Sequence, residues 1–353
     1  MKILVINPGS TSTKIAVFED EKQVWIKNIH HSADELKEFT RISDQYDYRK
    51  NYILAELKEA GYGIDFDAVI GRGGLLHPIS GGVYHVNDKM CEDLRNAKKE
   101  HASNLGALIA AEIAVLSHHC PAFIADPVVV DELQDVARVS GLSALPRISI
   151  FHALNQKAVA RRFAAEQGKK YEEMDLIVAH LGGGISVGAH HHGRVIDVNN
   201  ALDGEGPFSP ERAGTLPAGQ LVDLCFSGQY TQKEIKKMIS GKGGLVDHLG
   251  TNDSLKAEQA AEAGDRKAIL INEAMMYGVA KSIGAMHAVL KCKTEAILVT
   301  GGIAYSKPLM AFLKEFVQDM APVYVYPGED EMGALALNAL NVLRGEFAAQ
   351  EYR

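Results

Sequence analysis

The sequence feature that most constrains the fold is an internal repeat, because both halves of the chain contain the same strand–turn–strand pattern. The first copy covers residues 4–17 and the second covers residues 177–189. In each copy, an apolar run typical of a buried strand leads into a turn of small residues and then into a strand of alternating polarity. Gly9 lies in the first turn and Gly182 lies at the equivalent place in the second. This recurrence predicts a duplicated domain.

Two further pairs of segments repeat in the same order. Residues 67–74 resemble residues 295–302, and residues 121–125 resemble residues 322–326. Helical patterns lie between the strands, at residues 32–60 with a break near Ser43, and at 103–116, 152–167, 265–290 and 331–343. Each half therefore has three antiparallel strands followed by two crossover units, which form a mixed five-stranded sheet flanked by helices.

The repeats predict an α/β protein of two similar domains. We place the first domain at residues 1–151, completed by a C-terminal helix at about 331–353, and the second at residues 152–330. The additional residues of the second half form an insertion at about 200–260. A length of 353 residues suits two cores better than one. Two facing domains of this kind would leave a central cleft for a ligand.

Charge and composition argue against several classes of protein. A formal net charge of −8 disfavours a nucleic-acid-binding protein, which needs a basic face to meet phosphates. The apolar run that ends at Asn7 is too short for a signal peptide or a membrane span. The four cysteines have no disulfide or zinc spacing. The histidines at 190–192 are expected to point alternately on a hairpin, which predicts a solvated turn and not a metal site. We therefore expect a cytoplasmic protein with no nucleic-acid or membrane partner.

The two turns of small residues are candidate phosphate sites. Residues 7–12 and 181–186 carry few bulky side chains, so backbone N–H groups there can approach a phosphate closely. Lys14 either reaches that phosphate or extends along the surface of its strand. A tight hairpin also needs glycine for the turn itself, which is the alternative explanation. The chain contains no G-x-x-x-x-G-K-[ST] motif, which argues against a P-loop enzyme.

Four motifs resemble those of the acetate and butyrate kinase family. They are residues 7–14 (NPGSTSTK), 180–184 (HLGGG), 211–214 (ERAG) and 299–303 (VTGGI), and they follow the family order across nearly the whole chain. The compact length, the turn after His180 and residues 204–212 (GEGPFSPER) are more similar to the butyrate kinase branch than to acetate kinase. The resemblance implies duplicated ribonuclease H-like domains, the actin-like ATPase fold that sugar kinases and heat-shock chaperones share.

The resemblance also implies roles for individual residues. The phosphate-binding residues would be Asn7, Gly9, Ser10, Ser12, Lys14, Gly182, Gly183 and Gly184. The catalytic residues would be Arg72, Asp126, His152, His180 and Arg212. Asp253, Gly301, Gly302 and Ile303 would contact adenosine, and Glu331 would help to hold magnesium.

The chemistry of the basic residues agrees with these roles. A planar guanidinium pairs with two oxygens of a carboxylate or phosphoryl group, so Arg72 and Arg212 could bracket the group in transit. A surface salt bridge is the alternative for each arginine. His180 ends a strand before a glycine turn and could donate to the phosphoryl group. His152 either does the same or only begins a helix.

The acidic residues leave more alternatives open. Asp126 would orient magnesium or water, since a carboxylate substrate is already ionised near neutral pH and needs no strong base. It could instead cap the turn before Pro127, and Asp131 competes for its role. Glu329 competes with Glu331, and acidic residues at a helix N-terminus also occur without a metal.

The expected reaction converts ATP and a short-chain carboxylate into ADP and an acyl phosphate by direct in-line transfer, with Mg²⁺ on the nucleotide. Butyrate or a branched C4–C5 acid is the expected substrate, and the reverse reaction would make ATP. Val83, Pro78 and Leu202 are candidates for the acyl pocket. The resemblance implies a homo-oligomer, a dimer or higher, with residues 269–290 as interface or core. Two alternatives remain, a sugar kinase of the same fold and a non-catalytic ATP-binding module of the actin or chaperone type.

Overall fold

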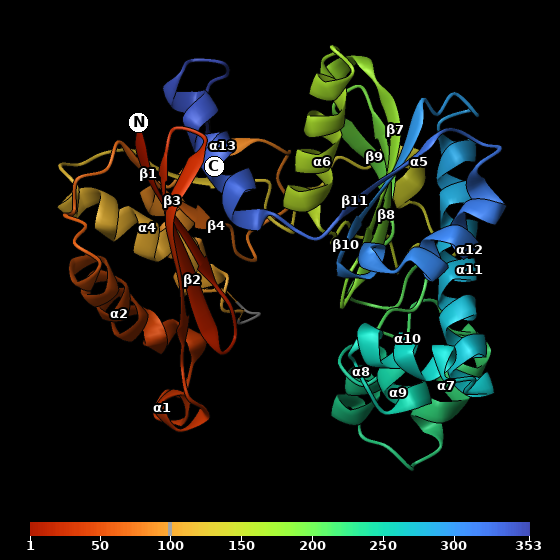
Figure 1. Ribbon diagram of the computed structural model, residues 1–353. Helices are drawn as coiled ribbons and strands as arrows, with labels where there is room; N and C mark the ends of the chain where they lie inside the picture. Colours follow the sequence, from red (N-terminus) through yellow and green to blue (C-terminus); the bar gives the residue numbers. More distant parts are fainter. Residues whose placement is uncertain (98–100) are drawn as a thin grey trace. The chain divides into compact units, whose positions relative to one another are not determined.

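The computed structural model describes residues 1–97 and 101–353, and the contacts within the chain divide it into two compact units (Figure 1). Unit 1 comprises Met1–Val130 and Asp330–Arg353, and unit 2 comprises Asp131–Glu329. The sequence placed two domains at 1–151 with 331–353, and at 152–330. These domain bounds stay a prediction.

The sheet of unit 1 has the strand order β12-β5-β6-β4-β1-β2-β3. Its strands are β1 (Lys2–Pro8), β2 (Ser12–Glu19), β3 (Lys22–His30), β4 (Ala68–Arg72), β5 (Val83–His85), β6 (Ala122–Ala125) and β12 (Gln350–Glu351). Strands β1, β2 and β3 form an antiparallel meander, and β4 and β6 continue the sheet in parallel with β1. The carboxyl ends of β1, β4 and β6 therefore lie at the same edge of this sheet.

Helices cover the sheet of unit 1 because their buried faces carry apolar residues at helical spacing. They are α2 (Tyr46–Glu59), α3 (Asp88–Arg95), α4 (Asn104–Leu116) and α13 (Glu331–Leu343). Helix α1 (Ala33–Lys37) has no buried residue, and a short 3₁₀ turn at Ile42–Gln45 precedes α2. Helix α4 packs on β4 and β6, and α13, from the far end of the chain, packs on β1 and β4. The first turn of α13 is thus brought to the sheet on which the N-terminal hairpin lies.

The sheet of unit 2 has the strand order β11-β10-β7-β8-β9. Its strands are β7 (Asp175–Leu181), β8 (Ile185–His191), β9 (Arg194–Val198), β10 (Ala296–Gly301) and β11 (Val323–Pro327). Strands β7, β8 and β9 are antiparallel neighbours, whereas β10 runs parallel to β7 and β11 runs parallel to β10. Strand β10 is buried along its whole length and β7 is buried after its first residue, Asp175, which explains their mostly apolar sequences.

Two helices sandwich the sheet of unit 2, with α6 (Ala153–Glu166) on one face and α11 (Arg266–Val289) on the other (Figure 1). Helix α12 (Lys307–Val317) packs on α11. The insertion forms a group of short helices, α7 (Ala218–Phe226), α8 (Gln232–Ile239), α9 (Leu245–Leu249) and α10 (Ser254–Glu262). The remaining elements are α5 (Asp135–Arg138) and the 3₁₀ turns at Tyr171–Glu173 and Gly302–Tyr305.

The repeat predicted from the sequence is confirmed. Strands β1, β2, β3, β4 and β6 of unit 1 have the order and directions of β7, β8, β9, β10 and β11 of unit 2. The prediction of five strands in each sheet is right for unit 2 and wrong for unit 1, whose sheet is extended by β5 and β12. These two strands have only three and two residues, which is too short to leave a recognisable period in the sequence. Within residues 1–97 and 101–353, no helix is both long and apolar enough to cross a bilayer.

Candidate active site

Three residues expected at the site meet in unit 1, at the edge where β1 and β4 end. Glu331, in the first turn of α13, accepts a hydrogen bond on Oε2 from Asn7 Nδ2 at 2.7 Å. Its other oxygen pairs with the guanidinium of Arg72. Arg72 and Glu331 are each about one-quarter exposed, so the pair is accessible and not buried in the core. Asn7 is also the cross-strand neighbour of Lys14, which places this exposed amine beside the same strand end.

The first small-residue turn joins β1 to β2 and is closed by a hydrogen bond from Gly9 N to Ser12 O at 2.8 Å. Ser10 is exposed and Ser12 is half-buried, so their hydroxyl groups remain accessible. The side chain of Arg49 in α2 holds this turn in place, and Arg49 was not predicted from the sequence as a site residue. Its guanidinium donates to the carbonyl oxygens of Gly9, Ser10 and Ser12 at 2.8, 3.0 and 2.9 Å.

Arg49 gives this turn a buried positive charge. The residue is fully buried, and its remaining partners are Gln45 Oε1 and Thr13 Oγ1. Every one of these acceptors is an uncharged oxygen, so the charge is solvated by dipoles and not neutralised. Burial lowers the pKa of Arg49 to about 10, which still leaves it charged at neutral pH. The sequence holds one signal of this role, because Arg49 occupies a stripe with Ile53 and Leu57 at a spacing of four residues on an otherwise apolar helix face.

Asp126 directly follows β6 and is almost fully buried. Its Oδ1 accepts a hydrogen bond from Gly82 N at 2.7 Å, and its own backbone N donates to Gly82 O at 3.0 Å. Its φ of 38° is rare for an aspartate and marks a backbone that the surrounding structure constrains. Asp131, which competed with it in the sequence, instead pairs with Arg138 at 2.5 Å in unit 2.

The second small-residue turn joins β7 to β8 in unit 2 and lies against Arg212. A β-carbon at Gly184 would fall 1.9 Å from Arg212 Nη1, so the guanidinium rests directly on the backbone of the turn. Arg212 Nη1 also donates to Ala201 O at 2.6 Å, and Ser209 Oγ donates to Gly183 O at 2.7 Å. Burial lowers the pKa of Arg212, although its charge persists because an arginine titrates far above neutral pH.

Two histidines stack in unit 2, with the ring centroids of His152 and His180 3.8 Å apart and the ring planes at 11°. His180 is buried, and both its nitrogens have partners, Asn155 Oδ1 at 2.8 Å from Nδ1 and Glu329 Oε1 at 3.2 Å from Nε2. A β-carbon at Gly182 would lie 3.0 Å from His180 Nε2, so the glycine turn leaves room for this ring. His152 sits at the N-cap of α6, but its ring makes no cap and instead bonds Ser186.

The residues expected to contact adenosine have different surroundings. Gly301 has a φ of 94° and lies against the backbone of Leu181, where a β-carbon would be 2.3 Å from the carbonyl oxygen. Gly302 has open space on its β-carbon side. The side chain of Ile303 is buried in the apolar core of unit 2. Asp253 caps α10 by accepting from the backbone N of Leu255 and Lys256, which explains its presence without a ligand.

Comparison with known proteins shows the family. The model of the acetokinase family matches residues 145–314. Two relatives, each called a probable butyrate kinase, come from Bacteroides thetaiotaomicron and Phocaeicola vulgatus. Both are 61% identical over 353 residues, which cover all of this chain and 100% and 99% of the relatives. The chain belongs to the acetokinase family.

A solved structure agrees with this membership of the acetokinase family. The crystal structure of acetate kinase from Porphyromonas gingivalis matches 97% of this chain and 99% of its own, with a TM-score of 0.80 and 19% identity. At this identity the match concerns the fold alone. It confirms the predicted α/β class of two mixed sheets, the actin-like ATPase fold.

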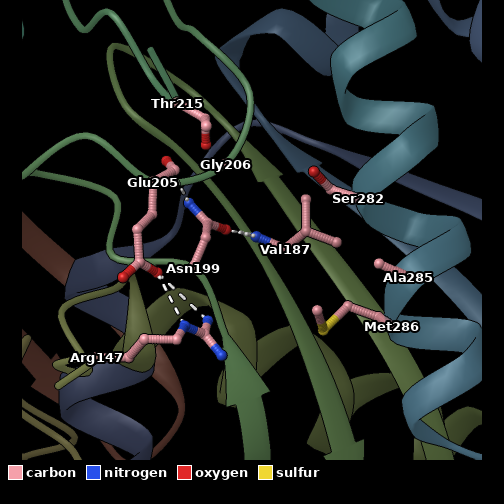
Figure 2. Close-up of a pocket in the computed structure, with 9 residues that line it drawn as sticks. All are labelled: Arg147, Val187, Asn199, Glu205, Gly206, Thr215, Ser282, Ala285 and Met286. Carbon is pink, nitrogen blue, oxygen red and sulfur yellow. Dashed lines mark hydrogen bonds and ion pairs between the residues drawn. The ribbon is translucent and has the colours of Figure 1, made fainter. Parts of the chain in front are cut away.

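A pocket of about 370 Å³ lies elsewhere in unit 2 of this acetokinase-family chain (Figure 2). It is lined by Arg147, Val187, Asn199, Glu205, Gly206, Thr215, Ser282, Ala285 and Met286, none of which was predicted as a site residue. Arg147 is neutralised there by Asp197 at 2.9 Å and Glu205 at 3.3 Å. Its charge is therefore not available to a second anion. Val83, Pro78 and Leu202, suggested for the acyl chain, do not line this pocket.

The histidines at 190–192 do not alternate as predicted. His192 has a φ of 48°, a left-handed conformation that turns its side chain toward the side of His191. Donor atoms of His191, His192 and Asp175 lie within 4.8 Å of one another, with His191 Nδ1 2.5 Å from Asp175 Oδ1. His190, in contrast, is fully buried and points into the interior of unit 2.

Proposed function

We propose that the protein transfers the γ-phosphoryl group of ATP to butyrate, giving ADP and butyryl phosphate. One observation carries the proposal, the 61% identity over the full length to two proteins called probable butyrate kinases. The attacking atom is a carboxylate oxygen of butyrate, which forms a bond to γ-phosphorus while the bond to the bridging oxygen of ADP breaks. No proton has to leave the nucleophile, so the reaction needs no strong base. The reverse reaction makes ATP, and the use of ATP supports a cytoplasmic location.

Each unit, taken by itself, holds donor groups of the kind that this reaction needs. In unit 2, Arg212 can donate to the phosphoryl oxygens beside the turn of Gly182, Gly183 and Gly184, and His180 can do so from Nε2 once the ligand replaces Glu329. In unit 1, Arg72 can pair with a carboxylate or phosphoryl group once it exchanges Glu331 for the ligand. The turn of Gly9, Ser10 and Ser12 offers hydroxyl and backbone donors above the buried charge of Arg49. Preorganised donors of this kind stabilise a transition state without reorganisation.

Mg²⁺ would neutralise charge on the ATP phosphates, and the oxygen ligands for it are present. The carboxylates of Asp126 and Glu331 are hard donors of the type that Mg²⁺ prefers. Both oxygens of Glu331 already have partners in Asn7 and Arg72, so the carboxylate is oriented before a metal binds. Glu329 pairs with His180 and is better suited to hold that ring. Adenosine is proposed to lie near Gly301 and Gly302, where the chain lacks side chains, with Asp253 and Ile303 as less direct contributors.

The exposed side of α11 supports a homo-oligomer, a dimer or higher. Leu270 and Tyr277 on α11 are 62% and 50% exposed, and Tyr277 makes an edge contact with Phe316 of α12. Apolar surface of this kind is commonly covered in assemblies. The molar mass in solution, measured by light scattering, tests this proposal.

The activity is tested by trapping acyl phosphate with hydroxylamine. The expected result is butyryl hydroxamate from ATP, Mg²⁺ and butyrate, with loss of several orders of magnitude for Arg72→Ala and Arg212→Ala. Acids from C2 to C5 should be compared, because each methylene contributes only about 1–3 kcal/mol of discrimination. Rapid phosphorylation of a sugar without hydroxamate would favour a sugar kinase. ATP turnover unchanged in both arginine variants would favour a non-catalytic module.

A further inference from the structure

A chain of buried polar side chains lies behind His152 and is not used by the reaction described above. Ser186, Gly188 and His190 are alternate residues of β8, so they share one face of the sheet, which α6 covers. Gln156 of α6 reaches over Gly188 and bonds both neighbours. A β-carbon at position 188 would lie 2.6 Å from Gln156 Oε1, so the glycine makes this bridge possible. Gln156, Ser186 and His190 are all fully buried.

The contacts of Gln156 fix the direction of these hydrogen bonds. Its Nε2 lies 3.1 Å from the carbonyl oxygen of Ser186, which can only accept, so the amide nitrogen must face β8 here. The same nitrogen donates to Ser186 Oγ at 2.8 Å. Gln156 Oε1 then faces His190 Nε2 at 2.9 Å and accepts its proton. The reverse orientation of the amide would place two carbonyl oxygens against each other.

The hydroxyl group of Ser186 consequently has one possible hydrogen-bond acceptor within the described part of the chain. Ser186 Oγ accepts from Gln156 Nε2 and lies 3.5 Å from the backbone N of His152, which is also a donor. Among the residues that the structure describes, His152 Nδ1 at 2.8 Å is the one acceptor within hydrogen-bond distance of this hydroxyl. A buried hydroxyl proton without an acceptor is costly. Ser186 therefore donates to Nδ1, which leaves the ring proton of His152 on Nε2.

The far end of the chain supports the same direction. His190 Nδ1 lies 2.7 Å from the hydroxyl of Tyr171, which is also buried. Burial lowers the pKa of His190 well below its usual value, and the positive charges of Lys157 and Arg161 lower it further. A neutral His190 that gives its Nε2 proton to Gln156 accepts from Tyr171 on Nδ1. In each hydrogen bond of this chain, the donor therefore lies on the Tyr171 side and the acceptor on the His152 side.

We infer that Ser186, Gln156, His190 and Tyr171 are positioning residues that hold His152 neutral, with its proton on Nε2. In this form His152 presents an N–H donor on the side of the ring opposite Ser186 and stacks on His180 as an uncharged ring. Such a donor can bind a phosphoryl oxygen, and no proton is transferred by it. The catalytic role of His152 in this inference rests on the proposed function. The position of the proton on its ring is independent of that function.

The position of the proton can be measured without activity. In protein labelled with ¹⁵N-histidine, two-bond ¹H–¹⁵N correlation spectra at neutral pH distinguish a protonated from an unprotonated ring nitrogen, and His152→Gln assigns the signal. The expected result is a protonated Nε2 and an unprotonated Nδ1. Protonation of Nδ1 in the unaltered protein would overturn the inference. A protein that formed no butyryl phosphate would defeat the proposed function and leave this measurement valid.

The effect on catalysis is tested by removing single hydroxyl groups. For Ser186→Ala, we expect mixed protonation of His152 and a fall of about tenfold in kcat, with KM for ATP and butyrate within about twofold. For Tyr171→Phe, which keeps the ring and serves even if Ser186→Ala fails to fold, we expect a fall in kcat of about threefold. Tyr352→Phe is the matched control, because Tyr352 is as buried as Tyr171 and its hydroxyl donates to Asp93 in unit 1. Equal kcat for Tyr171→Phe and Tyr352→Phe, with unchanged protonation of His152, would also overturn the inference.

Discussion

The guanidinium of Arg212 rests on Gly184 so closely that a β-carbon at position 184 would lie 1.9 Å from Nη1 and 2.5 Å from Cζ. The absence of a side chain at this one position therefore decides where the arginine can lie. The same nitrogen is held by Ala201 O at 2.6 Å, so the guanidinium cannot move without losing a hydrogen bond.

Gly184→Ala should displace Arg212 and lower kcat by about a hundredfold, since a misplacement of about 1 Å can have this effect. The free energy of unfolding should fall by about 1–3 kcal/mol, because the displaced guanidinium loses its hydrogen bond to Ala201 O. Steady-state hydroxamate formation measures the loss, and thermal unfolding checks the fold. Gly219→Ala is the control, since its β-carbon would meet nothing within 4 Å. Equal activity of the two variants would show that the contact with Arg212 is not needed.

Arg49 should stabilise the fold and the first phosphate turn together. Arg49→Met removes the donor to three partly buried carbonyl oxygens and leaves the buried Thr13 and Gln45 without this partner, so the free energy of unfolding should fall by about 3 kcal/mol. KM for ATP should rise, because the turn loses both its anchor and the charge beneath it. Lys50→Met is a matched control at the next position, where the ion pairs are partly exposed and should contribute no more than about 1 kcal/mol. Urea unfolding of both variants measures the difference, and similar losses would contradict the assignment.

The elements with long periodic patterns could be predicted from the sequence, and the contacts across long separations could not. The helix expected at 265–290 is α11 at Arg266–Val289, because its apolar residues recur over many turns. The left-handed conformation of His192 was missed, since its neighbours in the sequence suggest a regular strand. Asn7 and Glu331 were each expected at the site, but their hydrogen bond joins residues 324 positions apart and depends on how α13 returns to β1.

The buried residues behind the site were missed for a related reason. Arg49 and Gln156 lie on helices, where a polar residue is usually read as exposed. Their burial is possible only because a turn from another part of the chain or an opposite strand supplies the partners. In the sequence, each of these residues appears as a polar position within an apolar helix stripe. This pattern predicts a buried hydrogen bond only when the residue that accepts or donates it is known.

His31 should make the protein less stable in weak acid. Burial, and to a lesser degree the charge of Arg49, lowers its pKa to about 4. Between about pH 6.5 and 4, the unfolded chain binds a proton at His31 that the folded protein does not, so stability falls as the pH falls through this range. The loss is at most about 3 kcal/mol. Urea unfolding at pH 7.0, 5.5 and 4.5 should show a shallower pH dependence for His31→Gln. His30→Gln, at the exposed neighbouring position, should keep the original dependence, and identical slopes for both variants would contradict the prediction.

The roles of Glu331 and Glu329 can be distinguished by how the activity of each variant depends on the Mg²⁺ concentration. Glu331→Gln should raise the Mg²⁺ concentration for half-maximal rate by about tenfold, because it removes a charged oxygen that Asn7 and Arg72 orient. Glu329→Gln should lower kcat with little change in the Mg²⁺ requirement, since Glu329 acts on the ring of His180. Asp330→Asn, between them, should change neither quantity, because asparagine can also cap α13 by accepting from Gly333 N. Activity measured against the free Mg²⁺ concentration at saturating ATP distinguishes the two roles. If the Mg²⁺ concentration for half-maximal rate rose only in Glu329→Gln, the metal ligand would be Glu329.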